Sequence, residues 1–115
     1  MSNEELIAYL KSLDLKVETL DALGGGRFVV IRDHLIPVGR LQRDSRDVAV
    51  MWSTQVPYVM HSSVHVRPSV VPMGSGNSQA SPLGSDWQYL SRVLRGQPTP
   101  QRILAHINTV LAEVE

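Results

Sequence analysis

The chain has 115 residues, 43% of them hydrophobic and 19% charged, a composition typical of one globular domain, residues 1–115, with a single modest core. Eleven basic and eleven acidic side chains give a formal net charge of zero, so the basic surplus that favours nucleic-acid binding is absent. The chain contains no cysteine, which excludes disulfides, thiolate metal sites and a thiol nucleophile.

The sequence contains no run of about 20 apolar residues, the length that a membrane span needs. Its first residues also lack the pattern of a signal peptide. We therefore expect a cytoplasmic protein that has neither a membrane nor a nucleic acid as a partner.

A short helix is predicted at the N-terminus, ending near Ser12. Ser2 and Glu5 have the spacing of a capping box, and Leu6 and Leu10 lie on one face of the helix that follows. This face either packs on a sheet or binds a partner.

Four strands are predicted next, forming a meander. Alternating or β-branched residues mark them at 15–20, 27–31, 47–53 and 63–67. The three glycines at 24–26 indicate a turn. They do not form a phosphate-binding loop, because no Gly-Lys-Ser/Thr follows and the next segment is a strand.

A loop rich in glycine and serine is predicted at 73–84, and a short helix after it. Ser85 or Asp86 would cap this helix, with Trp87 and Leu90 on one face. A loop of this length between a strand and a helix is usually functional or mobile, although it can also be an inert surface loop.

The last helix is predicted from residue 100 to residue 114. Thr99 can cap it, and Pro100 suits its first position. Its apolar stripe consists of Ile103, Leu104, Ile107, Val110, Leu111 and Val114. The predicted fold class is therefore α+β: an antiparallel meander sheet with an N-terminal helix and C-terminal helices packed on one face or end.

Histidines offer little sign of a metal site. His61 and His65 would lie on one face of a strand but about 13 Å apart along it, too far for one ion without further ligands. His106 is expected at the boundary of the last helix. We therefore predict no metal and no cofactor.

Other polar groups are expected to be structural or solvated. Asp33 and His34 precede a turn and should face solvent. Three arginines alternate with aspartates, which indicates a solvated turn rather than a phosphate site; they are Arg40, Arg43 and Arg46. Trp52 and Trp87 are expected to anchor the core rather than to stack on bases.

The order of these elements resembles the ubiquitin-conjugating-enzyme fold, and more closely its prokaryotic family E. The resemblance spans about residues 15–115. It lies in the strands at 28–31 and 48–51, the Val-Arg-Pro at 66–68, the closing helix, and the sequence Trp-Gln-Tyr-Leu-Ser-Arg at 87–92. The family's usual motif there is Trp-Gln-x-Trp-Ser-Arg-His, so Leu90 and Val93 replace the second tryptophan and the histidine.

The resemblance implies a carrier that accepts the C-terminus of a ubiquitin-like modifier from an adenylating activating enzyme. Such enzymes use a cysteine thioester, which this chain cannot form. In the window where the cysteine would precede Trp87, the chain has Ser78 and Gln79, with Ser81 nearby. Ser78, then Ser81, are therefore the predicted acceptors of an oxyester, and Asn77 is predicted to help to stabilise the oxyanion.

Three explanations of the missing cysteine remain open. A serine takes its place, the domain is a non-catalytic variant that binds the activating enzyme or the modifier as a scaffold, or a natural cysteine has been replaced in this sequence. An unrelated α+β interaction protein, such as a chaperone, is a further alternative.

Overall fold

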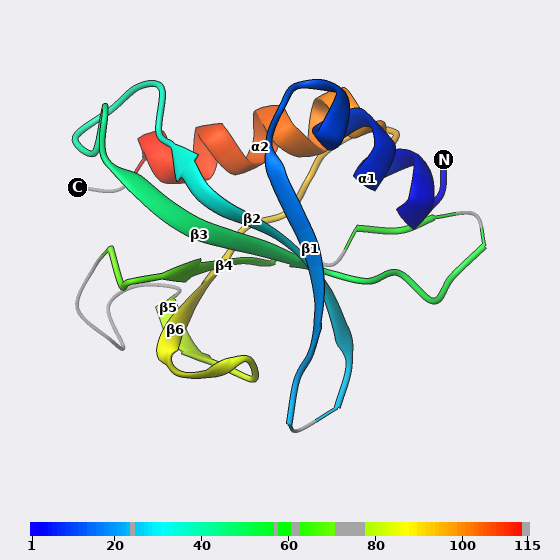
Figure 1. The fold of residues 1–115 in the computed structure, drawn as a ribbon, viewed down its shortest axis with the longest axis horizontal. Coiled ribbons are helices and arrows are strands. Elements are labelled where there is room, and N and C mark those ends of the chain that lie inside the picture. Colours follow the sequence, from blue (N-terminus) through cyan, green and yellow to red (C-terminus); the bar gives the residue numbers. More distant parts are fainter. Residues whose placement is uncertain (24, 57, 61–62, 71–77, 114–115) are drawn as a thin grey trace.

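The computed structural model describes residues 1–23, 25–56, 58–60, 63–70 and 78–113. These residues form two helices and one six-stranded antiparallel sheet with the strand order β1-β2-β3-β4-β6-β5 (Figure 1). The predicted α+β class, with a helix at each end of the chain and an antiparallel meander between them, is confirmed.

The first four strands form the meander close to the predicted positions. They are β1 (Lys16–Asp21), β2 (Arg27–Leu35), β3 (Ser45–Met51) and β4 (Ser63–Arg67). In β2 the four residues from Phe28 to Ile31 are all buried, so this strand is covered on both faces. Burial on both faces explains its continuous β-branched and aromatic composition.

The helix predicted from residue 85 or 86 is wrong, because this segment is a strand. Residues Ser78–Ser81 form β5 and Gly84–Ser91 form β6, joined in a hairpin. Trp87 and Leu90 do not share one face, as they would in a helix. They point to opposite faces of β6, and each is buried in a different apolar cluster.

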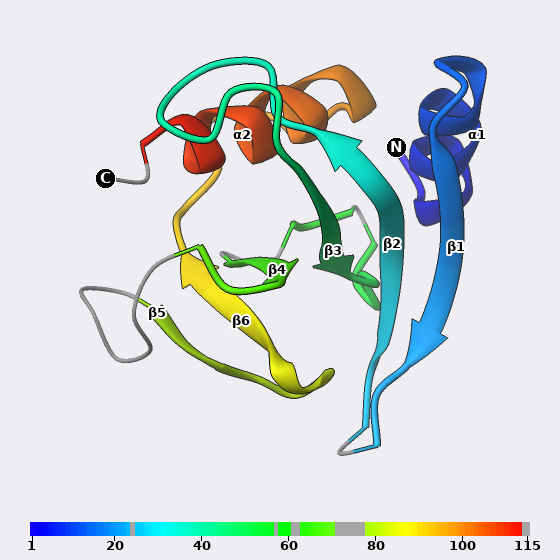
Figure 2. The ribbon, with the colours of Figure 1, turned by 60° about the vertical axis from the view of Figure 1, so that its left-hand side comes forward.

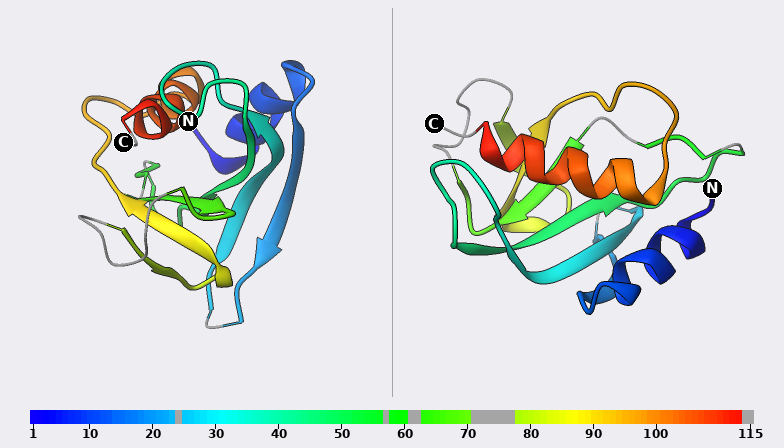
Figure 3. Two further views of the ribbon diagram at one scale, coloured as in Figure 1. Left: turned by 90° about the vertical axis from the view of Figure 1, so that its left-hand side faces the viewer. Right: turned by 90° about the horizontal axis from the view of Figure 1, so that it is seen from above.

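Both helices lie on the same side of the sheet (Figures 1 and 3). In α1 (Asn3–Ser12), the Ser2 hydroxyl accepts from the Glu5 N–H at 3.1 Å, as the capping pattern predicted. Helix α2 (Pro100–Ala112) begins after Thr99, whose hydroxyl accepts from the Arg102 N–H at 3.1 Å.

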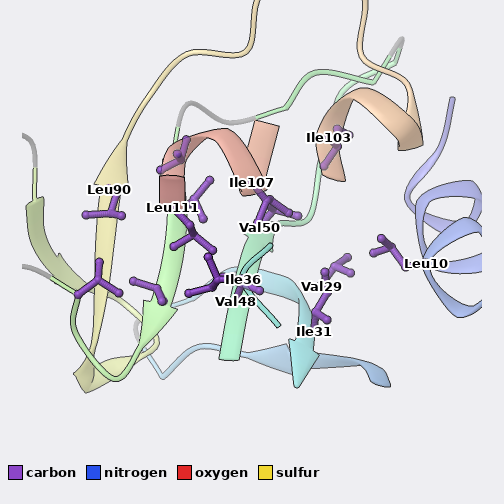
Figure 4. Packing of buried hydrophobic residues seen from close by; sticks show 14 of the residues in the cluster. Leu10, Val29, Ile31, Ile36, Val48, Val50, Leu90, Ile103, Ile107 and Leu111 are labelled. Carbon is purple, nitrogen blue, oxygen red and sulfur yellow. The ribbon is translucent and has the colours of Figure 1, made fainter. Parts of the chain in front are cut away.

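The main core fills the space between these helices and the sheet (Figure 4). It joins the inward residues of α1 and α2 to alternate residues of the central strands; those drawn include Leu10, Val29, Ile31, Val48, Val50, Leu90, Ile103, Ile107 and Leu111. Because Leu6 and Leu10 are at most 1% exposed, the apolar face of α1 packs within the domain and is not free for a partner.

A second, smaller cluster lies on the face of the sheet without helices. Phe28, Val30, Ala49 and Trp87 form it, with Leu83 of the β5–β6 turn packed against it. The β5–β6 hairpin bends away from the helices on this side (Figure 2). This second face also contains the predicted site residue Ser81, which is described next.

Candidate functional site

Ser81 is the predicted acceptor whose side chain the structure describes. It ends β5, pairs with Gly84 across the hairpin turn and is only 8% exposed. Its hydroxyl oxygen accepts a hydrogen bond from the Leu83 N–H at 3.1 Å, which fixes the turn. Ser81 is therefore a buried turn residue, not the exposed loop serine that the sequence predicted.

The second partner of this hydroxyl is His65 in β4. His65 Nδ1 lies 2.7 Å from Ser81 Oγ, and its Nε2 lies 3.2 Å from Ser63 Oγ. The imidazole is 2% exposed. Sequence reasoning placed His65 with His61 as a weak metal pair and missed its contact with Ser81.

The strands and two aromatic rings hold the imidazole in place. His65 is paired with Ala49 of β3 and Tyr89 of β6, so it sits inside the sheet rather than at an edge. The Phe28 ring meets it edge-on at a centroid distance of 4.8 Å, and the Tyr89 ring lies at 5.6 Å. A ring fixed in this way orients Nδ1 toward β5.

The Ser81–His65 contact has the geometry of a nucleophile and its base. With the ring proton on Nε2, donated to Ser63, Nδ1 accepts the proton of the Ser81 hydroxyl. A base within about 2.6–3.2 Å is what an activated serine requires. Burial of both groups works against this chemistry, because an incoming acyl group must first reach the hydroxyl.

Of the other two predicted site residues, the structure places only Ser78. Ser78 begins β5, opposite Leu90, so the predicted 73–84 loop is wrong for its second half. Asn77 lies outside the described residues, as do residues 73–76 of that loop.

Two hydrogen bonds hold the backbone of Val70, the last described residue before 71–77. The buried Gln88 side chain accepts from the Val70 N–H at 3.1 Å, and Arg40 Nη2 donates to the Val70 carbonyl at 3.0 Å. Gln88 belongs to the Trp-Gln-Tyr-Leu-Ser-Arg sequence. In a strand, a glutamine between Trp87 and Tyr89 would have indicated a buried polar contact. The segment was predicted as a helix, so this contact was missed.

A row of alternating charges runs across the sheet beside the second apolar cluster. From β1 to β6, it consists of Glu18, Arg32, Asp47, Arg67 and Asp86. Asp47 is its centre, since Oδ2 accepts from Arg32 at 3.0 Å and from Arg67 at 2.8 Å, while Oδ1 accepts from the Asp33 N–H at 3.0 Å. We name these five residues the charge row.

The Asp47 carboxylate is held in its charged form. Burial raises its pKa, but the hydrogen bonds from the Asp33 backbone, Arg67 and Arg32 outweigh burial and bring the pKa below the ordinary value of 3.8. The Arg67 guanidinium also lies over the Trp87 ring, 4.9 Å from its centroid. The charge row and the second apolar cluster are therefore in contact, through Arg67 and Trp87.

The histidine at 34 does not face solvent, contrary to the prediction. It is 5% exposed, and its Nε2 lies 2.7 Å from Asn108 Oδ1 of α2. The pairing of β2 with β3 shifts between Ile31 and His34, and Asp33 has a φ of 50°. This irregularity in β2 turns the imidazole toward the helix side and leaves Asp33 exposed.

The three arginines of the predicted solvated turn have separate roles. Arg43 is exposed, Arg40 reaches Val70, and Arg46 is half-buried and lies 4.0 Å from Asp44. His61 lies outside the described residues, and within the described ones no three histidines or acids are placed to hold a metal ion.

Comparisons with protein-family models, with curated proteins and with solved structures give no match. Neither α1 nor α2, the helices of the described residues, is long and apolar enough to cross a membrane.

Proposed function

We propose that the chain is a ubiquitin-conjugating-enzyme-like module that binds an adenylating activating enzyme or a ubiquitin-like modifier without a covalent step. The order of an N-terminal helix, an antiparallel meander and a closing helix supports this proposal. The sequence at 87–92 supports it as well, although residues 87–91 form the second part of strand β6 and not the start of a helix, and Arg92 follows the strand.

The observation that carries the non-covalent proposal is the state of Ser81, the predicted acceptor whose side chain the structure describes. The chain has no cysteine, and the hydroxyl of Ser81 is enclosed and already engaged by Leu83 and His65. Transfer of a modifier requires an acceptor that a bulky acyl adenylate can reach. A scaffold needs no such group.

Helix α1 limits where the activating enzyme can dock. Its Leu6 and Leu10 are buried in the core. The Asn3 side chain makes hydrogen bonds with both the N–H and the carbonyl of Ser53. Glu4 and Glu5 are exposed in its first turn. We therefore propose an electrostatic rather than an apolar contact at this helix.

Isothermal titration with the adenylating enzyme and the ubiquitin-like protein encoded nearest to the chain's own gene tests the proposal. We expect a complex of micromolar or tighter affinity with one of them, and no adduct after incubation with ATP. Glu4→Lys with Glu5→Lys should weaken binding to the enzyme, whereas the exposed Asp14→Lys should not. Absence of a complex with either protein would contradict the proposal.

A second function, an oxyester carrier, is favoured by one observation: the 2.7 Å contact between Ser81 and His65. In this reaction Ser81 Oγ attacks the carbonyl carbon of the modifier's acyl adenylate and its proton passes to His65 Nδ1. AMP leaves with its phosphate oxygen, so one ester replaces one mixed anhydride.

Gel analysis of the ATP reaction separates the two functions. An oxyester carrier gives an adduct that resists thiol reductant and is cleaved by hydroxylamine. The adduct should disappear in Ser81→Ala and persist in Ser78→Ala. Loss in Ser78→Ala instead would move the acceptor to Ser78, and no adduct with any variant leaves the scaffold as the function.

A further inference from the structure

The imidazole of His65 has a second hydroxyl at its other end. Ser63 begins β4, two residues before His65, and in a strand this spacing puts both side chains on one face of the sheet. Ser63 Oγ lies 3.2 Å from His65 Nε2, while Ser81 Oγ lies 2.7 Å from Nδ1. The ring therefore lies between two serines, each close enough to transfer its proton to the nitrogen that it faces.

The tautomer of the ring decides which serine it can activate, because a neutral imidazole has one donor nitrogen and one acceptor nitrogen. With the proton on Nε2, the acceptor faces Ser81. With the proton on Nδ1, this nitrogen donates to Ser81 Oγ, and Nε2 accepts the hydroxyl proton of Ser63. Ser81 Oγ also accepts from the Leu83 N–H, and its two lone pairs allow it to accept both bonds.

Exposure favours Ser63 as the serine that reacts with an incoming molecule. Ser81 is 8% exposed, whereas Ser63 is half-buried at the start of its strand. An activated serine needs a base, and the base needs a third group that orients it. In this order Ser63 is the nucleophile, His65 is the base, and Ser81 is the positioning residue that accepts from Nδ1–H.

We propose that Ser63 is acylated by small acyl donors whose leaving group departs without a proton, such as the acyl adenylates of small acids. Ser63 Oγ attacks the carbonyl carbon, and its proton passes to His65 Nε2 and then to solvent. The bond from the carbon to the phosphate oxygen breaks, and AMP leaves with the electron pair, so one ester replaces one mixed anhydride.

The burial of His65 limits the donors. The imidazole is 2% exposed, so it can accept the proton of the adjacent hydroxyl but cannot deliver it to a leaving group in the incoming molecule. AMP needs no such proton, because the second pKa of a phosphomonoester is near 6. Alkyl esters and amides, whose leaving groups must be protonated, should not react. This activity is separate from the proposed conjugation function, since a scaffold binds its partner without it.

The probe is p-nitrophenyl acetate, incubated with the full chain, because p-nitrophenolate also departs without a proton. Peptide mass spectrometry at early times should locate an acetyl group on Ser63, added at least about tenfold faster than on the exposed Ser85. His65→Gln removes the base and keeps a polar side chain, so it should lower the rate at Ser63 about 100-fold. Acetylation of Ser81 in place of Ser63, or equal rates at Ser63 and Ser85, would overturn the proposal.

Two further measurements do not require the His65 variant to fold. Nitrogen-15 NMR of the imidazole in the wild type shows which ring nitrogen carries the proton, and we expect Nδ1; a proton on Nε2 would assign the base to Ser81 and contradict the proposal. Ser81→Ala removes the acceptor of Nδ1–H, so it should move the ring proton to Nε2 and slow acetylation of Ser63 about tenfold. Ser85→Ala is the control and should change neither. If Ser81→Ala also changes neither, Ser81 does not position the ring and the proposal is wrong.

Discussion

The two faces of the sheet are stabilised in different ways. The face under α1 and α2 is mostly aliphatic and joins side chains from both helices and five of the six strands in one core. On the opposite face, the apolar cluster among the described residues has four buried members, and this face adds the charge row and the Ser81–His65 contact. The first face is held mainly by non-directional burial, with a few hydrogen bonds such as His34–Asn108, whereas the second depends more on groups that must meet at fixed distances.

This difference separates stability from chemistry within one sheet. An aliphatic core tolerates exchanges of similar volume, because no single contact defines it. A partner lost from a buried polar pair leaves the other group unsatisfied, which makes the second face sensitive to single changes. The Ser81–His65 contact, a hydroxyl beside a positioned base, lies on that second face.

Trp87→Ala tests the second face most severely. Trp87 is 2% exposed and joins the second apolar cluster to Arg67, so we expect a loss of about 3–5 kcal/mol in the free energy of unfolding. Denaturant titration measures it. The half-buried Trp52, which borders the helix-side core, is the control and should lose less. A loss under about 1 kcal/mol for Trp87→Ala would show that this face is not anchored there.

Asp47→Asn breaks the charge row at its centre. The change leaves Arg32 and Arg67 without their shared carboxylate, and we expect a loss of about 1–3 kcal/mol. The exposed Asp33→Asn is the control and should stay within about 0.5 kcal/mol.

The difference in stability between wild type and Asp47→Asn should depend on pH. Because the folded-state pKa of Asp47 is below 3.8, its contribution is fully present above that pH and lost as the pH falls through the folded pKa. Wild type and Asp47→Asn should therefore converge in stability under acid. A constant difference down to pH 2 would contradict the role of the carboxylate charge.

Ser81→Ala should have a smaller effect. It removes a neutral hydrogen bond to His65 and the acceptor of the Leu83 N–H, for an expected loss of about 1 kcal/mol. Thermal unfolding measures it, with the exposed Ser85→Ala as control. Equal stability of the two variants would mean that the Ser81–His65 contact does not fasten the hairpin.

The smallest effect is expected at His106, on the boundary of the helix side. Burial lowers its folded-state pKa below 6.5, so its contribution is complete above pH 6.5 and is lost as the pH falls through the folded pKa. His106→Gln should reduce the slope of stability against pH between about 7.5 and 5.5. An unchanged slope would mean that a group other than His106 causes the change of stability with pH.

Local patterns were sufficient for most of the fold. The strands of the meander have β-branched alternation, and both confirmed helices have caps at the expected residues, Ser2 and Thr99. The spacing of Trp87 and Leu90 misled the prediction, because residues three apart share a face in a helix but occupy two faces of a strand. Because this sheet is covered on both faces, Trp87 and Leu90 are both buried although they point in opposite directions.

The candidate site was less accessible to sequence reasoning. Ser81 and His65 are 16 residues apart, and only the pairing of β4 with β6 and of β6 with β5 brings them together. His34 meets Asn108 across 74 residues because of an irregularity in β2. No local pattern reports such contacts, since they are set by strand register.

Strand β6 is also the common attachment of the two ends of the stretch 71–77. Gln88 of this strand holds Val70, and Leu90, two residues further along, pairs with Ser78. The distance between Val70 and Ser78, which the stretch must span, is thus set by their contacts with β6. Longer or shorter sequences should be interchangeable here, since doubling a connection costs only about 0.6 kcal/mol. The Gln88 contact with Val70 and the pairing of Leu90 with Ser78 should therefore persist when the connection between Val70 and Ser78 changes in length.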